Sequence, residues 1–578
     1  MIDPALLCSW GSTKLSTMTH KKICWHVAAA VCLLLPVAAH TQSMSMPGMG
    51  DAQTNSAPVS TAPMSVEKLG SVNFSVSCKP STQAPFNRGI ALLHSFGYTQ
   101  AERQFKSIVA ADPNCAMAHW GVAMSQYHEI WAHPEEGALE VGVAQMQQAN
   151  ALAVNPKLKI TSREISYIFA LSDFFSRAPV TYQTGADAYV AGMASLHADY
   201  PDDVDGAAFY ALALLADVAP NDTSLTKERK ALAVLLPLFA KYPDHPGLAH
   251  YIIHTCDTPA LAQQGLTAAQ VYAKIAPSSP HALHMPSHIF ARLGMWQQDI
   301  DSNLASVAAS EQDEQQHEPG VAHQMHADEF LIYAYLQTGQ DEKAKSLVYS
   351  LPSTGRHIDA LPGSDDMKGM TPMFVNELTA IYLMETHDWA AIKALQPAAG
   401  SDPMDTWYVW WAEGVAAGHL HDASLAGSAL TRFDDVLALM KTSGQEYRLN
   451  DMQVYRNEIA GWKAYTTGDA DGAVAALRAA ADQQDKLGQG EVDLPAREML
   501  GDLLMLLKKP ANALAEYKTA LTLSPNRLNG LLSAGEAAEA AGKPDEAKGF
   551  YAQAAASTNH GRDTTRTDVA HAVQMAKL

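Results

Sequence analysis

The chain has 578 residues, of which 47% are apolar and 17% are charged, and its formal net charge is −21. This length exceeds one ordinary hydrophobic core and predicts several domains or a repeat array, while the apolar content excludes bulk disorder. The negative charge disfavours nucleic acid and anionic membrane surfaces as partners.

Residues 1–39 have the pattern of a signal peptide. Lys21 and Lys22 form a basic start, residues 24–37 form an apolar core, and residues 37–39 form a small-residue cleavage site, with Met18 as a possible true start. No later run of eighteen apolar residues occurs. We therefore expect an exported protein, periplasmic or secreted, with no stable membrane span; an uncleaved anchor is the alternative.

Beyond the leader, the chain is poor in cysteine and begins with a polar segment. Only Cys78, Cys115 and Cys256 remain, so at most one disulfide forms within the chain. Residues 40–81 are rich in Met, Ser and Pro, and we expect a flexible tail. Its thioethers could bind Cu(I), although an exposed linker is the plainer interpretation. The methionines concerned are Met44, Met46 and Met49.

An internal repeat of 34 residues organises the rest of the chain. Gly501 and Tyr517 recur as Gly535 and Tyr551, and the small residues between them recur at the same spacing. This is the tetratricopeptide pattern of helix pairs. We predict an all-α, right-handed solenoid of stacked helix pairs in two sub-arrays. The predicted parts are an N-terminal array at 82–358, a Gly/Pro/Asp-rich linker at 359–372, a C-terminal array at 373–556 and a C-terminal tail at 557–578.

Four segments resemble a group of exported bacterial tetratricopeptide-repeat (TPR) proteins. They read LLHSFGYTQAERQF, CAMAHWGVAM, HYIIHTCD and PHALHMPSHIFARLGMW. The resemblance implies the fold, and it implies no particular activity. It also implies that positions 2, 5, 9, 12 and 13 of the first helix in each repeat line a concave groove.

Nine of the 23 histidines fall between residues 245 and 326. With Pro246 as position 1 of a repeat, His250, His254 and Asp257 occupy positions 5, 9 and 12. With Pro280 as the next position 1, His281, His284 and His288 occupy positions 2, 5 and 9. Counting from the turn glycine Gly339 places His326 at position 2 and Glu329 at position 5 of the following repeat. These side chains are therefore expected to face one groove.

This set is a candidate metal site, since neutral imidazole suits zinc, copper, iron and nickel. We expect His250, His254, His284 and His288 to be ligands, with Asp257 as a further ligand. His281 and His326 are supporting groups or alternative ligands. One structural ion, one catalytic ion with an open position, or two ions remain possible. Copper, zinc and iron are the candidate metals.

Pro286 complicates this site because a proline inside a helix interrupts it. If a new helix begins at Pro286, the four-residue spacing of His284 and His288 no longer guarantees one face. His94, His119 and His128 border the start of the groove, where packing is the expected role and a second site the alternative.

Three functions are compatible with these patterns. The first is an exported TPR solenoid that binds a transition metal, either as a metal-dependent enzyme or without catalysis. The second is a peptide- or protein-binding scaffold without metal. The third is a non-catalytic copper-handling protein that uses the methionine-rich tail. The sequence contains no phosphate-binding loop, nucleophile elbow or dinucleotide fingerprint.

Overall fold

The computed structural model describes residues 67–577 except 129, 131–133, 178–180, 220, 316–323, 362–368 and 563. The predicted signal peptide, the methionines of the tail, His317, His323 and half of the 359–372 linker lie outside the described residues. Within the described residues every regular element is a helix and no strand occurs. None of these helices is both long enough and apolar enough to cross a membrane.

The first helices run from α1 to α13. They are α1 (Gln83–His94), α2 (Tyr98–Ala111), α3 (Ala116–Met124), α4 (Glu136–Ala153), α5 (Ser162–Arg177), α6 (Tyr182–Asp199), α7 (Val204–Ala216), α8 (Thr226–Lys241), α9 (Pro246–Cys256), α10 (Ala262–Ile275), α11 (Pro280–His284), α12 (Pro286–Arg292) and α13 (Trp296–Gln315).

The remaining helices run from α14 to α26. They are α14 (Gln324–Gln337), α15 (Asp341–Asp359), α16 (Thr371–Glu385), α17 (Trp389–Lys393), α18 (Trp407–His419), α19 (Ala423–Thr442), α20 (Leu449–Thr466), α21 (Ala470–Leu487), α22 (Ala496–Leu506), α23 (Pro510–Leu523), α24 (Leu528–Ala540), α25 (Pro544–Ser557) and α26 (Thr567–Met575). Single 3-10 turns occur at Pro80–Thr82, Pro403–Thr406, Glu446–Arg448 and Asn559–Gly561.

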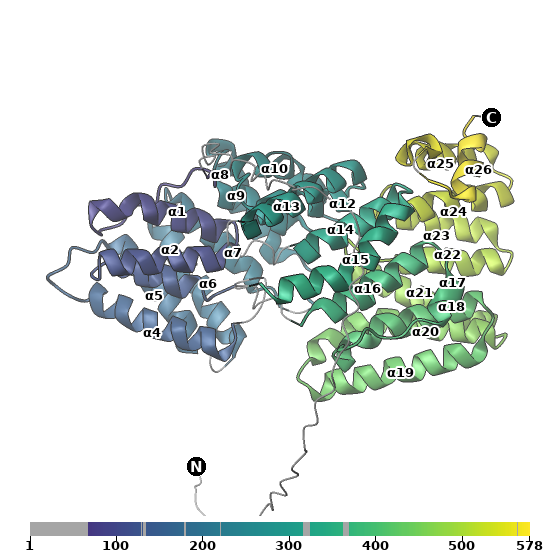
Figure 1. The fold of residues 1–578 in the computed structure, drawn as a ribbon, viewed down its shortest axis with the longest axis horizontal. Coiled ribbons are helices and arrows are strands. Elements are labelled where there is room, and N and C mark those ends of the chain that lie inside the picture. The colour runs from purple at the N-terminus through teal and green to yellow at the C-terminus, as the bar shows by residue number, and fades with distance from the viewer. Residues whose placement is uncertain are drawn as a thin grey trace, which may run out of the picture. The chain divides into compact units, whose positions relative to one another are not determined.

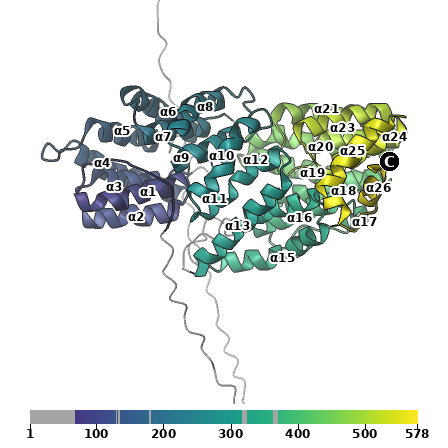
Figure 2. The same ribbon diagram turned by 90° about the horizontal axis from the view of Figure 1, so that it is seen from above.

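Consecutive helices pack in pairs, and the first helix of one pair also packs on the first helix of the next, as in α14, α16, α18 and α20. Figures 1 and 2 show this order as a continuous change of colour along the stacked pairs. The predicted all-α, TPR-like solenoid is therefore confirmed. The repeat glycines explain the close packing: a Cβ at Gly501 or Gly535 would lie 2.5 Å from a ring carbon of Tyr517 or 2.4 Å from one of Tyr551.

The end of the predicted flexible tail is ordered, which corrects the expected boundary at residue 81. Phe74 is fully buried and stacks on Trp120 with ring centroids 6.0 Å apart. Ser77 donates to the Glu164 carboxylate, and Cys78 forms a disulfide with Cys115. Composition averaged over the whole segment concealed these anchoring residues. At the other end, the predicted C-terminal tail contains helix α26, which packs on α25.

Two large apolar clusters fill the described part of the molecule. One extends from Leu69 to Phe290 and the other from Ala291 to Ala572. They meet within α12, rather than at the predicted linker. Later parts of the chain return to contact the end of α12 and the start of α13: Trp296 Nε1 donates to the Asn526 carbonyl at 2.8 Å, and Arg292 donates to the Gln489 carbonyl. The same return brings Glu491 to His288, with Glu491 Oε1 3.2 Å from His288 Nδ1.

Candidate metal centre

Local sequence places the histidines on short helices with defined starts. Pro246 and Pro280 occupy the first turns of α9 and α11, and the Ser279 hydroxyl caps α11 by accepting from the Ala282 amide at 3.2 Å. As anticipated from Pro286, the helix is interrupted at Met285 and restarts as α12. Met285 keeps a right-handed helical conformation, so the chain kinks without turning away. His284 and His288 therefore stay together, with their Nε2 atoms 3.0 Å apart.

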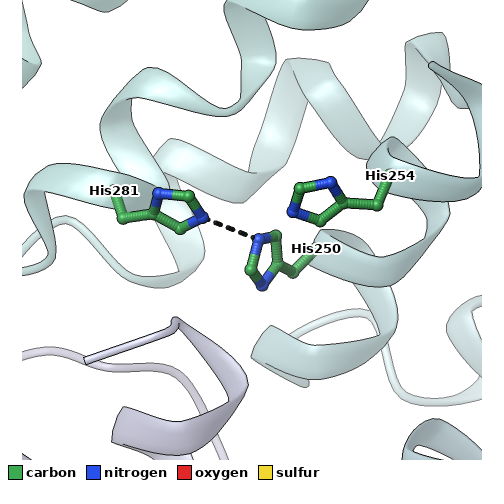
Figure 3. Close-up of side chains that lie close together, drawn as sticks. All are labelled: His250, His254 and His281. Carbon is green, nitrogen blue, oxygen red and sulfur yellow. Dashed lines mark hydrogen bonds between the residues drawn. The ribbon is translucent and has the colours of Figure 1, made fainter. Parts of the chain in front are cut away.

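The first group of histidines, which we call triad A, consists of His250, His254 and His281. Their nearest nitrogen atoms all lie within 4.8 Å of one another. Two of the rings come from α9 and the third reaches in from α11, as Figure 3 shows. The Nε2 atoms of His250 and His281 are 3.0 Å apart. The Nε2 atom of His254 is buried and has no hydrogen-bond partner.

The second group, triad B, consists of His284, His288 and His326, and its nitrogen atoms meet the same 4.8 Å limit. The two triads are neighbours. Ring centroids of His254 and His288 are 6.2 Å apart, and those of His281 and His284 are 6.3 Å apart. The six predicted histidines are thus brought together, but as two groups of three. The four histidines expected as ligands therefore do not surround one shared point.

Both triads share one pattern of repeat positions. Each takes an i, i+4 pair from positions 5 and 9 of one repeat and a single histidine from position 2 of the next. The pairs are His250 with His254 and His284 with His288; the single histidines are His281 and His326. Each triad also packs on one phenylalanine. The ring centroid of Phe96 lies 4.4 to 5.3 Å from the ring centroids of the three histidines of triad A, and that of Phe330 lies 4.7 to 5.3 Å from those of triad B.

Hydrogen bonds orient four of the six rings through Nδ1. The Nδ1 partners are the His94 carbonyl for His250 at 2.6 Å, Asn303 Oδ1 for His284 at 2.6 Å, Asp257 Oδ2 for His288 at 2.9 Å and Glu329 Oε2 for His326 at 2.9 Å. Each partner is an acceptor, so each Nδ1 carries the proton. In the neutral form of such a ring the lone pair is on Nε2, and hydrogen bonds of this kind are how proteins orient metal-binding histidines.

The distances between facing nitrogens suit a shared ion. Two imidazole nitrogens bound to one ion at about 2.1 Å lie roughly 3.0 to 3.4 Å apart for angles of about 90 to 110°. The two Nε2–Nε2 distances of 3.0 Å fall in this range. Two bare lone pairs at this distance repel each other, and either a proton or a metal ion between them removes the repulsion.

Charge and burial differ between the triads. Burial, with the nearby charges of other histidines, lowers the pKa of His254 to about 3 and holds the pKa of His250 well below its usual value, so both rings are neutral at pH 7. Burial also opposes protonation of His288, but the charge of Asp257 and hydrogen bonds to Asp257 and Glu491 outweigh it and raise the pKa to about 10. Burial raises the pKa of Cys256 to about 12, so its thiol is a poor ligand.

Asp257 is placed behind a histidine, on its Nδ1 side. Its Oδ2 accepts from His288 Nδ1, and its Oδ1 accepts from Arg292 Nε at 3.0 Å. Glu491 approaches the same His288 nitrogen at 3.2 Å and pairs with Arg292. Ligand atoms of Asp257, His288 and Glu491, one from each, also lie within 4.8 Å of one another, so Asp257 stays a candidate ligand. His281 and His326, which were expected as supporting groups or alternative ligands, each belong to one triad.

Sequence reasoning missed several residues of this centre. Asn303 and Phe330 lie outside the four matching segments, Phe96 lies in one of them but was given no role, and Glu491 lies 203 residues from His288. The orientation of Asn303 is fixed because its Nδ2 donates to Asp299 at 2.7 Å, which leaves Oδ1 for His284. The one local feature of the sequence that pointed to Asn303 was its four-residue spacing from Asp299, which places the two side chains on one face of a helix.

The histidines at the start of the groove have other partners. His94 binds Tyr251 through Nδ1 and Asp205 through Nε2, at 3.0 and 2.9 Å. His245 binds Asp205 through Nε2 at 3.2 Å, and its Nδ1 caps α9. Another possible metal group, His94 with Asp205 and His245, therefore has a partner on every ring nitrogen.

His119 and His128 lie outside both triads. His119 Nδ1 binds Gln145 at 2.7 Å. The His128 ring stacks on Tyr98 with centroids 4.3 Å apart, and its Nε2 contacts the Ser125 carbonyl. These contacts are those of side chains packed between helices.

The sequence matches no protein-family model and no curated protein. Among solved structures, the chain is similar to a human IFIT1 dimer with m7Gppp-AAAA, at 12% identity and a TM-score of 0.33, covering 76% of this chain and 89% of that one. It is also similar to the human IFIT1 dimer with PPP-AAAA, at 11% identity and a TM-score of 0.35, covering 76% and 90%. Likeness at this level says nothing about ligands.

Proposed function

We propose that this protein is an exported TPR-type solenoid that binds transition-metal ions through triads A and B. The observation that carries the proposal is the common orientation of the rings: four Nδ1 atoms are held by acceptors, and in each triad two Nε2 atoms face each other at 3.0 Å. The buried, unpartnered Nε2 of His254 adds to it, since an unsatisfied buried acceptor costs about 1 to 3 kcal/mol.

The donor set suggests the kind of site. Three imidazoles suit zinc, copper or iron once His288 has released its extra proton, and they leave a further position for water or substrate, as in catalytic rather than structural zinc sites. The carboxylates that orient His288 and His326 lie beside triad B, where they could accept a proton from a bound water. We therefore extend the proposal to metal-dependent catalysis. Export rests on the leader pattern, and membership of the exported TPR group rests on the four matching segments.

Metal content of the purified full chain tests this proposal. After removal of metal and reconstitution with Zn²⁺, Cu²⁺, Fe²⁺, Ni²⁺ or Mn²⁺ in turn, elemental analysis should find up to two ions per chain for at least one metal. His254→Ala should remove the ion of triad A and His326→Ala that of triad B. The exposed His560 provides a matched control in His560→Ala, which should keep both ions.

Two results would contradict the proposal. Less than a tenth of an equivalent of every metal in the folded wild type would exclude metal binding, and a binding scaffold would remain. Retention of both ions in a variant that lacks all six histidines would place the metal elsewhere. Circular dichroism on each variant separates loss of metal from loss of fold.

A further inference from the structure

A cavity of about 220 Å³ lies next to triad B. It is lined by α14, α16, α18 and α20 and by the segment at 490–493. Two of its residues also touch the triad: Glu329 accepts from His326 at 2.9 Å, and Glu491 contacts His288 at 3.2 Å. At about 30 Å³ per water, this volume holds a molecule of roughly seven non-hydrogen atoms.

Four carboxyl groups line this cavity, those of Glu329, Glu377, Glu491 and Asp493. Among the described residues that line it, none is a lysine, arginine or histidine. Burial and the charge of Glu329 hold the pKa of Glu377 well above its usual value, and burial raises the pKa of Asp493 to about 7. Glu491 pairs with Arg292 and Glu329 with His326, whereas the charges that raise the pKa of Glu377 are those of other carboxylates. A cation bound beside Glu377 would relieve this repulsion.

The remaining walls are aromatic: Trp407, Tyr408, Trp411 and Tyr455. The ring of Trp407 lies 4.6 Å from that of Tyr455, and Trp411 lies 5.1 Å from the same ring. Aromatic faces around a desolvated space bind organic ammonium groups through cation–π attraction. Ca²⁺ or Mg²⁺ would gain nothing from such walls, because these ions select oxygen ligands.

Trp407 supplies an independent indication of a ligand. The side chain is 4% exposed, lines the cavity, and has an indole N–H without a hydrogen-bond partner. Since buried Trp N–H groups usually find an acceptor, the ligand should carry an oxygen as well as a positive charge.

We propose that this cavity binds a small organic ammonium compound that carries a hydroxyl or other oxygen acceptor. The cation lies against Glu377, Asp493 and the aromatic walls, and the oxygen accepts from Trp407. The inference rests on the proposed function only in placing this ligand beside the ion of triad B; the cavity itself needs no metal.

Calorimetric or tryptophan-fluorescence titration with choline and ethanolamine tests the proposal, with 3,3-dimethylbutan-1-ol as the uncharged analogue of choline. We expect at least one of the two ammonium compounds to bind tenfold or more tightly than the uncharged analogue. Glu377→Gln should weaken its binding about tenfold, and Trp407→Phe several-fold. The controls are Glu413→Gln and Trp410→Phe on the same helix as Trp407; Glu413 pairs with Arg432, and Trp410 Nε1 donates to Thr406, so neither should change binding.

Each titration is performed on metal-free and on metal-loaded protein, with metal content measured separately. Ammonium binding to metal-free protein would support the cavity even if the triads held no metal. Failure of both ammonium compounds to outbind the uncharged analogue would overturn the inference, with or without metal. So would unchanged affinity in folded Glu377→Gln, or competition by Ca²⁺ without any ammonium preference.

Discussion

Replacing Asn303 tests whether Nδ1 hydrogen bonds prepare the histidines of triad B for metal. Asn303 is fully buried and accepts from His284 Nδ1 at 2.6 Å. Asn303→Leu keeps the approximate volume and removes this acceptor. The Ser287 hydroxyl lies 3.4 Å from the same nitrogen and is a weaker replacement. Loss of such an orienting partner typically weakens metal affinity about 10- to 100-fold, which is roughly 1.4 to 2.7 kcal/mol.

The measurement is competition between the protein and a chromophoric zinc chelator. His254→Ala provides the background, because it leaves triad B as the single site. Adding Asn303→Leu should raise the zinc dissociation constant at least tenfold. Asn529→Leu is the control: Asn529 is also buried, 9% exposed, but hydrogen-bonds Glu385 and Arg566. A zinc affinity that changes less than threefold in a folded Asn303→Leu protein would refute the role assigned to Nδ1.

Three further predictions concern stability. The Cys78–Cys115 disulfide closes a loop with a sequence separation of 37, so Cys78→Ser with Cys115→Ser should lower the free energy of unfolding by about 4 kcal/mol in urea denaturation; no change would show that the bond does not form. Burial raises the pKa of the Asp502 carboxyl from 3.8 to about 7, so the folded protein favours the neutral carboxyl and loses stability as the pH rises from 4 to 7. Asp502→Asn, which can still accept from Tyr517, should gain up to about 4 kcal/mol of unfolding free energy relative to wild type between those pH values. Parallel curves of unfolding free energy against pH for the two proteins would contradict this. Gly501→Ala should lower the free energy of unfolding by about 1 to 3 kcal/mol, because the new Cβ would clash with Tyr517. Gly549→Ala, which has open space around it, should raise the free energy of unfolding by roughly 0.5 to 1 kcal/mol. Equal effects of the two substitutions would refute the packing argument.

The sequence was sufficient for the helices and for their register around the histidines. Prolines mark the starts of α9, α11 and α12, and the 34-residue repeat carries the glycine and tyrosine that let paired helices approach. These features are local, because each depends on residues within one helix pair. The ordered segment from Leu69 to Cys78 escaped this reasoning, since its anchors Trp120 and Glu164 belong to later repeats.

The division into two triads could not be predicted from spacing alone. His250 is oriented by a carbonyl 156 residues away, and His288 is contacted by a carboxylate 203 residues away. These distances in sequence are closed only when the solenoid returns on itself, which depends on small angles between many helix pairs. The repeat positions did contain the pattern, since positions 5, 9 and then 2 supply both triads, but only the packed helices show that position 2 of one repeat reaches the preceding repeat.

The short nitrogen–nitrogen contacts inside the two triads would need different proton arrangements. A bound metal ion is the simpler explanation, because it would account for both contacts in the same way. In triad B the raised pKa of His288 allows its Nε2–H to donate to His284. In triad A burial keeps His250 and His254 neutral, so the 3.0 Å contact requires the Nε2–H tautomer of His281. That proton serves His250 and leaves His254 Nε2 without a partner. A metal ion of the kind we propose would satisfy all three nitrogens in either triad, so one kind of ligand would account for the same geometry at two successive repeats.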